Sequence, residues 1–233
     1  MGIRVLMSEK KTGIINTLVI ISAAVFVWLW SDKSGGVIYS AYGGIEIESR
    51  ELNLIKLGKW LFIYGLYFLL LIKQLTDNKK TQLFSIYRFG SFKAWWKSYF
   101  LKIHLLMLGS YVISCLVFYV IELITDNHSS NTIEVLFIFY VHLATYIIII
   151  IACNQMFTKS LVPCVLIVFE GITYLISVQS SVMISSCGMY TSMSRIDSKC
   201  MIITIMMAQL LIGYVCYYIV IWLWKKDYLD VIG

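Results

Sequence analysis

Long apolar segments separated by short polar segments run along the whole chain. Six of the apolar segments are long enough to cross a bilayer, which requires about 20 helical residues. We predict transmembrane helices over residues 14–30, 57–73, 103–123, 135–153, 161–178 and 201–224. The single proline, Pro163, falls in the first turn of the fifth segment, where its missing N–H is least costly. The pattern predicts an all-α membrane protein with one transmembrane domain over residues 1–233.

The polar segments alternate between the two sides of this predicted bundle. Residues 31–55, 124–134 and 179–200 form the loops of one side, which we assign as the outer side. Residues 76–100 lie on the other side and contain a Gly-Ser break after a short amphipathic piece. Ser91 is expected to cap a helix that begins at Phe92 and continues into the third apolar segment.

Composition and charge narrow the class of protein further. Hydrophobic residues make up 60% of the chain and charged residues 14%, with a mean hydropathy of +0.82, which excludes an ordinary soluble domain. Thirteen of the nineteen Lys and Arg residues lie in segments that are cytoplasmic if the N-terminus is inside. The positive-inside rule therefore places both termini in the cytoplasm. The basic residues flank apolar segments instead of forming a stripe, so nucleic acid is not an expected partner.

Known catalytic and cofactor motifs are missing from the sequence. It contains no HExxH or GxSxG, and the pairs Gly35-Gly36 and Gly43-Gly44 lack the GK[ST] ending of a phosphate-binding loop. No Cys and His spacing indicates a metal site. We expect no catalytic residue, metal or cofactor in this chain. Cys187 and Cys200 share the last outer loop, where a disulfide and two free thiols are both open alternatives.

Three polar residues interrupt the apolar segments at a common depth. His142, Glu170 and Gln209 each lie about eight residues from the outer end of their segment, roughly 12 Å below the outer surface at a helical rise of 1.5 Å per residue. A carboxylate at that depth requires a partner or water, and His142 is a candidate partner for Glu170. The three residues either line a substrate path or form a hydrogen-bonded clasp between helices, and both interpretations stay open.

One motif resembles a known family. The sequence Tyr87-Arg88-Phe89-Gly90-Ser91, followed by Trp95-Trp96, resembles the R-[YF]-G-S-x-x-x-W-W signature found after the second transmembrane helix in permease subunits of type-2 ATP-binding-cassette (ABC) transporters from Gram-positive bacteria. The motif covers about ten residues, and the six-segment layout agrees over the whole chain. The resemblance implies a coupling helix between helices two and three and a re-entrant outer segment within 179–200. The short N-terminal head and the long loop 31–55 depart from the family pattern.

The resemblance also implies a function. Related permeases export, or give immunity to, bacteriocins, lantibiotics and amphipathic peptides such as phenol-soluble modulins. The expected complex lies in the bacterial plasma membrane and contains two permease subunits, identical or related, with two ATPase subunits that bind ATP and Mg²⁺. Trp95 and Trp96 would anchor the following helix at the inner membrane interface. The expected ATPase-docking surface consists of Phe84, Tyr87, Arg88, Phe89, Gly90 and Ser91.

Two alternatives to this function are open. The segment around Ser91 is alternatively an amphipathic helix held against anionic lipid by its Lys and Trp side chains. The whole chain is alternatively a stand-alone immunity or accessory protein that binds a toxic peptide without ATP. Isolation of the chain with or without an ATPase distinguishes these alternatives from the permease.

Overall fold

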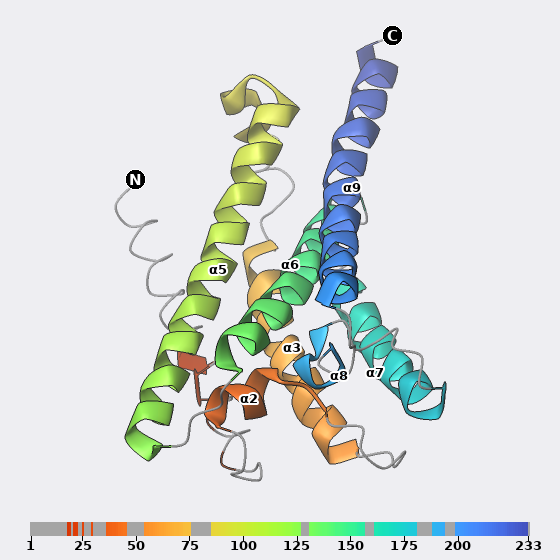
Figure 1. Ribbon diagram of the computed structural model, residues 1–233. Helices are drawn as coiled ribbons and strands as arrows, with labels where there is room; N and C mark the ends of the chain where they lie inside the picture. Colours follow the sequence, from red (N-terminus) through yellow and green to blue (C-terminus); the bar gives the residue numbers. More distant parts are fainter. Residues whose placement is uncertain are drawn as a thin grey trace.

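Helices form all the regular structure in the part of the chain that the structure describes. The computed structural model describes residues 18, 19, 21, 22, 25, 29, 36–45, 54–75, 85–126, 131–156, 161–180, 188–193 and 199–232. The helices within these ranges, shown in Figure 1, are α2 (Val37–Tyr42), α3 (Leu54–Leu75), α5 (Phe92–Thr125), α6 (Thr132–Met156), α7 (Val162–Ser180), α8 (Tyr190–Met193) and α9 (Lys199–Ile232).

Within the described residues, four helices are long and apolar enough to cross a membrane. They are α3, α5, α6 and the part of α9 up to Trp224, while the apolar part of α7, Val162–Ile176, is shorter. Within the predicted first segment, 14–30, the six described residues are helical. The prediction of an all-α membrane protein is therefore confirmed for four helices, and the count of six remains a prediction.

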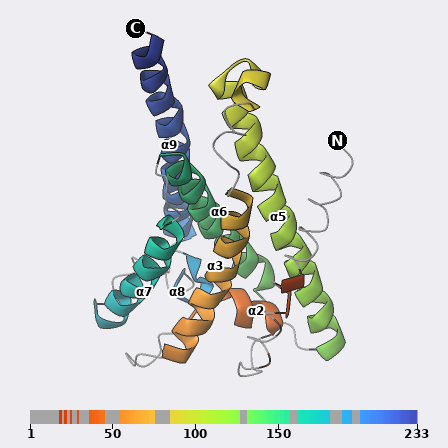
Figure 2. The same cartoon turned by 180° about the vertical axis from the view of Figure 1, so that it is seen from behind.

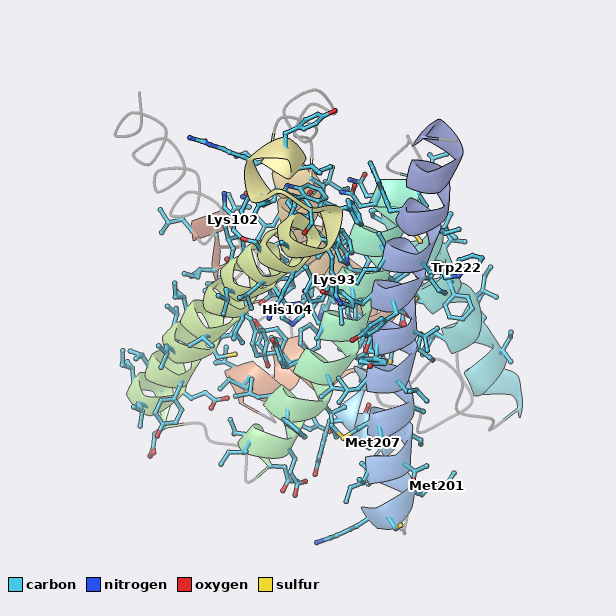
Figure 3. All side chains as sticks on the ribbon, turned by 90° about the horizontal axis from the view of Figure 1, so that it is seen from above. Lys93, Lys102, His104, Met201, Met207 and Trp222 are labelled. Atoms are coloured by element: carbon cyan, nitrogen blue, oxygen red, sulfur yellow. The ribbon has the colours of Figure 1, made fainter. Side chains whose placement is uncertain are left out.

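Helix α6 lies at the centre of the bundle, with α5 on one side and α9 on the other (Figures 1 and 2). It is apolar on all sides, and 72% of its most apolar 18-residue stretch is buried inside the protein, as expected for a helix surrounded by others. In α9 the corresponding share is 17%, and Met201, Met207 and Trp222 are exposed along it (Figure 3). The outer helices therefore present wide apolar faces, which suit contact with lipid.

Helix α5 begins as the sequence predicted. The backbone turns at Gly90, which has a positive φ of 69°, and the Ser91 hydroxyl accepts a hydrogen bond from the N–H of Ala94 at 3.2 Å. From Phe92 the helix continues without a break for 34 residues, a length of about 51 Å. Residues 85–89, just before the turn, are also helical. We call residues 85–91 the tip; it lies at the opposite end of α5 from α2 (Figure 1).

Two of the predicted outer loops, 31–55 and 179–200, contain short buried helical segments. Residues 36–45 include α2, whose Val37, Ile38 and Tyr42 are fully buried. Residues 188–191 are also buried and are hydrogen-bonded directly to residues 36–45. Thr191 donates from its N–H to the Gly43 oxygen and from its hydroxyl to the Ile45 oxygen, both at 3.0 Å. We call residues 36–45 and 188–191 together the cap.

The two parts of the cap pack against each other, and the cap also packs against buried aromatic residues of the core. Gly44 has a φ of +93°, and a Cβ atom there would lie 2.5 Å from the Cβ of Met189, so only glycine fits. Tyr42 packs among Tyr111, Phe118 and Phe139 and shares a hydrogen bond with the Tyr67 hydroxyl at 3.1 Å. Burial raises the pKa of Tyr42 well above its usual range, so its hydroxyl stays neutral. The cap is thus a packed part of the protein.

Glu122 fixes the start of α2 to α5. Its carboxylate is 1% exposed, and Oε1 accepts a hydrogen bond from the N–H of Ile38 at 2.8 Å. Helix N-termini carry unpaired N–H groups and a partial positive charge, and Gly36 at the N-cap offers no side chain to satisfy them. A carboxylate from α5 therefore takes the place of a local capping residue.

Replacing Glu122 with alanine is expected to lower the free energy of unfolding by about 1 kcal/mol, because the buried N–H of Ile38 loses its acceptor. Glu122→Gln keeps an oxygen at the same position and should lose less. The melting temperatures of the two variants in one detergent would check this. Equal melting temperatures for the alanine and glutamine variants would contradict the capping role.

Candidate functional site

The three polar residues predicted at a common depth meet in the structure. His142 on α6 lies between Glu170 on α7 and Gln209 on α9. Its Nε2 is 2.9 Å from Glu170 Oε1, and its Nδ1 is 3.3 Å from Gln209 Oε1. All three side chains are buried, with Glu170 1% exposed. The pairing of His142 with Glu170 that the sequence suggested is therefore present.

Two aromatic residues complete this site, and sequence reasoning missed both. Tyr146 donates its hydroxyl proton to Glu170 Oε1, and Trp60 Nε1 donates to Oε2 at 3.5 Å. Tyr146 lies four residues after His142 and so on the same helix face, which was the one signal available. Trp60 comes from α3, and nothing in the sequence distinguished it from the other tryptophans. We call these residues, His142, Glu170, Gln209, Tyr146 and Trp60, the polar cluster.

Aromatic rings and the cap enclose the polar cluster. The His142 ring lies against Tyr146 and Tyr64, with centroids 4.4 and 5.8 Å away, and Phe139 stacks on Tyr64 at 5.2 Å. The backbone of Gly188 lies directly on the imidazole, because a Cβ atom built there would be 2.5 Å from His142 Cδ2. The Glu170 side chain is thus buried among partners from the protein itself.

The polar cluster links four helices through a chain of hydrogen bonds. Helices α3, α6, α7 and α9 each contribute at least one of its members. A buried carboxyl group is tolerated when it is hydrogen-bonded, and both oxygens of Glu170 meet this condition. Among the described residues, no three His, Cys, Asp or Glu side chains gather as metal ligands. The arrangement is that of a clasp in the packed state, and a path through it would require the helices to separate.

The tip presents the residues of the expected docking surface. Tyr87 is 82% exposed and Phe89 is 48% exposed, and Arg88, Gly90 and Ser91 are exposed beside them. Phe84 lies outside the described residues. Large exposed aromatic side chains next to an arginine are typical of protein-binding surfaces. Lys93 and Lys102, labelled in Figure 3, add positive charge along the first turns of α5.

Trp95 and Trp96, which the resemblance implies as anchors of the following helix at the inner membrane interface, are buried inside the protein, at 4% and 0% exposure. Their depth in the membrane stays a prediction. Trp96 stacks on Tyr217 of α9 with centroids 5.8 Å apart, and Trp95 stacks on Tyr99 at 4.9 Å. Trp96 thus packs α5 against α9, while Trp95 packs on rings of α5 itself.

For Cys187 and Cys200 the sequence leaves two alternatives, a disulfide and two free thiols. Cys200 is exposed in the first turn of α9. Cys187 lies outside the described residues, directly before Gly188 in the sequence. The disulfide and the two free thiols therefore both stay open alternatives.

Comparisons with known proteins identify no relative. The chain matches no protein-family model, no curated protein and no solved structure. The resemblance to type-2 ABC permeases rests on the motif from Arg88 to Ser91 with Trp95-Trp96, and on the pattern of apolar segments.

Proposed function

We propose that this chain is the permease subunit of an ABC exporter that moves amphipathic or antimicrobial peptides, driven by a separate ATPase subunit that docks on the tip. One observation carries the proposal. The exposed side chains of Tyr87, Arg88 and Phe89 lie just before the turn at Gly90, beside the start of α5, which continues unbroken for 34 residues to the other end of the bundle. A surface suited to binding a partner is thus connected to the rest of the protein by a rigid element.

Helix α5 would transmit movement of the tip in two directions. Close to the tip, Phe92 stacks on Trp224 of α9 with centroids 4.3 Å apart, and Trp96 contacts Tyr217. At the far end, Glu122 holds α2 and with it the cap. A push on the tip by the ATPase would therefore displace α9 at one end and the cap at the other.

The proposed complex has two permease chains and two ATPase subunits in the bacterial plasma membrane. Each permease chain would cross the membrane six times with both termini in the cytoplasm, and the ATPase subunits would supply ATP and Mg²⁺. The wide apolar faces of α5, α7 and α9 suit lateral contact with lipid and with an amphipathic peptide. The permease itself would carry no catalytic group.

Replacing Arg88 or Phe89 with alanine is expected to uncouple ATP hydrolysis from peptide export and to weaken ATPase binding about tenfold, since central arginine and aromatic residues contribute most to protein interfaces. Copurification from the native host with mass spectrometry, followed by ATPase and export assays in vesicles, would measure both effects. Tyr119→Ala is the matched control, because Tyr119 is an exposed aromatic on α5 far from the tip.

Two results would contradict the proposal. Wild-type coupling in both tip variants would remove the docking assignment. Purification of the chain with no ATPase, together with protection of cells by the chain alone, would favour the stand-alone immunity or accessory protein.

A further inference from the structure

We infer that the surface against which α2 packs is a binding site for a short amphipathic helix, and that a peptide helix with the same pattern of side chains competes with α2 for it. We call this surface the α2 site, and it consists of Tyr67 on α3, Tyr111, Phe118 and Glu122 on α5, and Phe139 on α6. An amphipathic peptide is also the substrate class of the proposed function, so the choice of ligand rests on that function.

Helix α2 lies against α3, α5 and α6 in the way that a bound peptide helix does (Figures 1 and 2). Its apolar side chains occur at positions i, i+1, i+4 and i+5, and each is at most 1% exposed: Val37, Ile38, Ala41 and Tyr42. The other two residues, Tyr39 and Ser40, are half-buried. An amphipathic helix that binds in the hydrophobic groove of a partner buries one apolar face in this manner.

The walls of the α2 site are held together by contacts that do not involve α2. Tyr111 stacks on Phe139 with centroids 5.9 Å apart, and the centroids of Tyr67 and Phe139 are 6.2 Å apart. The Tyr111 hydroxyl donates to the Leu136 oxygen at 2.8 Å. These contacts join α3, α5 and α6 to one another. The site therefore has the pre-formed character that is usual for ligand sites.

Helix α2, in contrast, depends on the site for its conformation. Six residues are too few for a stable isolated helix, which requires about 12–15. Gly36 at its N-cap has a φ of 79° and provides no capping side chain. The site provides the missing partners: Glu122 Oε1 accepts from the N–H of Ile38 at 2.8 Å, and the Tyr67 hydroxyl shares a hydrogen bond with the Tyr42 hydroxyl at 3.1 Å.

These contacts also define the class of ligand. Glu122 accepts from a backbone N–H, which every residue except proline offers. The ring of Tyr42 lies 4.6 to 5.7 Å from three rings of the site, so the main side-chain anchor is aromatic and carries a hydroxyl. Residues 36–45 contain no charged side chain. The expected ligand is a short helix with two aliphatic residues, a small residue and a tyrosine on one face, and its polar residues on the other.

A synthetic peptide with the sequence of residues 36–45 and a fluorophore at its C-terminus tests this site. Its binding to the full chain in lipid nanodiscs would be measured by fluorescence anisotropy, with empty nanodiscs as the reference for partition into lipid. Tyr42→Ala removes the main anchor of α2 and should raise the affinity for the peptide about tenfold or more. Ser40→Ala is the matched control, because Ser40 lies on α2 outside the four buried side chains, and it should bind the peptide as the wild type does. Equal affinity in the wild type and a folded Tyr42→Ala variant would overturn the inference.

A conservative variant measures displacement of α2 directly. Val37→Cys places a thiol of similar size at a fully buried position. Maleimide labelling of this thiol, distinguished by mass spectrometry from the six native cysteines, should rise with the concentration of unlabelled peptide. Unchanged labelling would overturn the inference even if Tyr42→Ala does not fold. Neither measurement involves an ATPase, so a peptide that fails to displace α2 while the tip variants still uncouple export would refute the α2 site and leave the proposed function standing.

Discussion

Glu170→Ala is expected to cost most of the folded protein that can be extracted from membranes. The substitution removes the partner of His142 and leaves Tyr146 and Trp60 with donors that have lost their acceptor. Breaking a buried charge pair typically costs about 3–5 kcal/mol. That amount is comparable to the whole stability of many proteins, which is about 5–15 kcal/mol. Fluorescence-detected size exclusion and the melting temperature would measure the loss.

Glu170→Gln serves as the control for this prediction. The amide keeps an oxygen that can accept from Tyr146 or Trp60, and its loss should be nearer to about 1–2 kcal/mol. If the alanine variant is as abundant and as stable as the glutamine variant, Glu170 does not hold the helices together. The polar cluster would then be an incidental contact between α6, α7 and α9.

A double variant separates the two interpretations that the sequence left open. In His142→Leu/Glu170→Leu both polar groups are gone, and replacing a buried pair by apolar side chains is often neutral or stabilising. The double variant should therefore recover much of the stability that Glu170→Ala loses. Export at the wild-type rate by a stable double variant would indicate that the polar cluster is a clasp. A stable but inactive variant would indicate that its polar groups act in transport.

The sequence predicted the parts of this fold that depend on local signals. Hydropathy and length were sufficient for α3, α5, α6 and α9. The start of α5 followed from Gly90 and Ser91, because a positive φ and a capping hydroxyl are properties of those two residues. The meeting of His142, Glu170 and Gln209 followed from depth alone, since equal depth in neighbouring helices is a condition for contact.

The parts that the sequence did not predict depend on long-range contacts. Helix α2 has six residues and α8 has four, which is too short for a periodic pattern, and their burial depends on the bonds of Thr191 to Gly43 and Ile45. Trp96 has the same position in the sequence whether it faces lipid or α9. Burial of the tryptophan follows from the placement of α9, more than a hundred residues later in the chain.

Gly188→Ala is expected to disrupt the polar cluster from the side of the cap. The added Cβ would lie 2.5 Å from His142 Cδ2, 2.7 Å from its Cγ and 2.8 Å from the Tyr64 hydroxyl. These are atoms of rings, and His142 is held by hydrogen bonds on both nitrogens, so the ring cannot swing aside without breaking one of them. Such overpacking typically costs about 1–3 kcal/mol.

A matched substitution shows whether this loss is specific to the cap. Gly109 lies inside α5, and a Cβ added there meets nothing within 4 Å, so Gly109→Ala should leave stability unchanged or raise it by about 0.5–1 kcal/mol. The melting temperature and the ¹⁵N signals of His142 should both change in Gly188→Ala and neither in Gly109→Ala. A Gly188→Ala variant with wild-type melting and unchanged His142 signals would mean that the cap does not rest on His142. If both measurements change as expected, the cap and the polar cluster form one unit. Movement of α5 that displaces α2 would then also displace the His142–Glu170 pair.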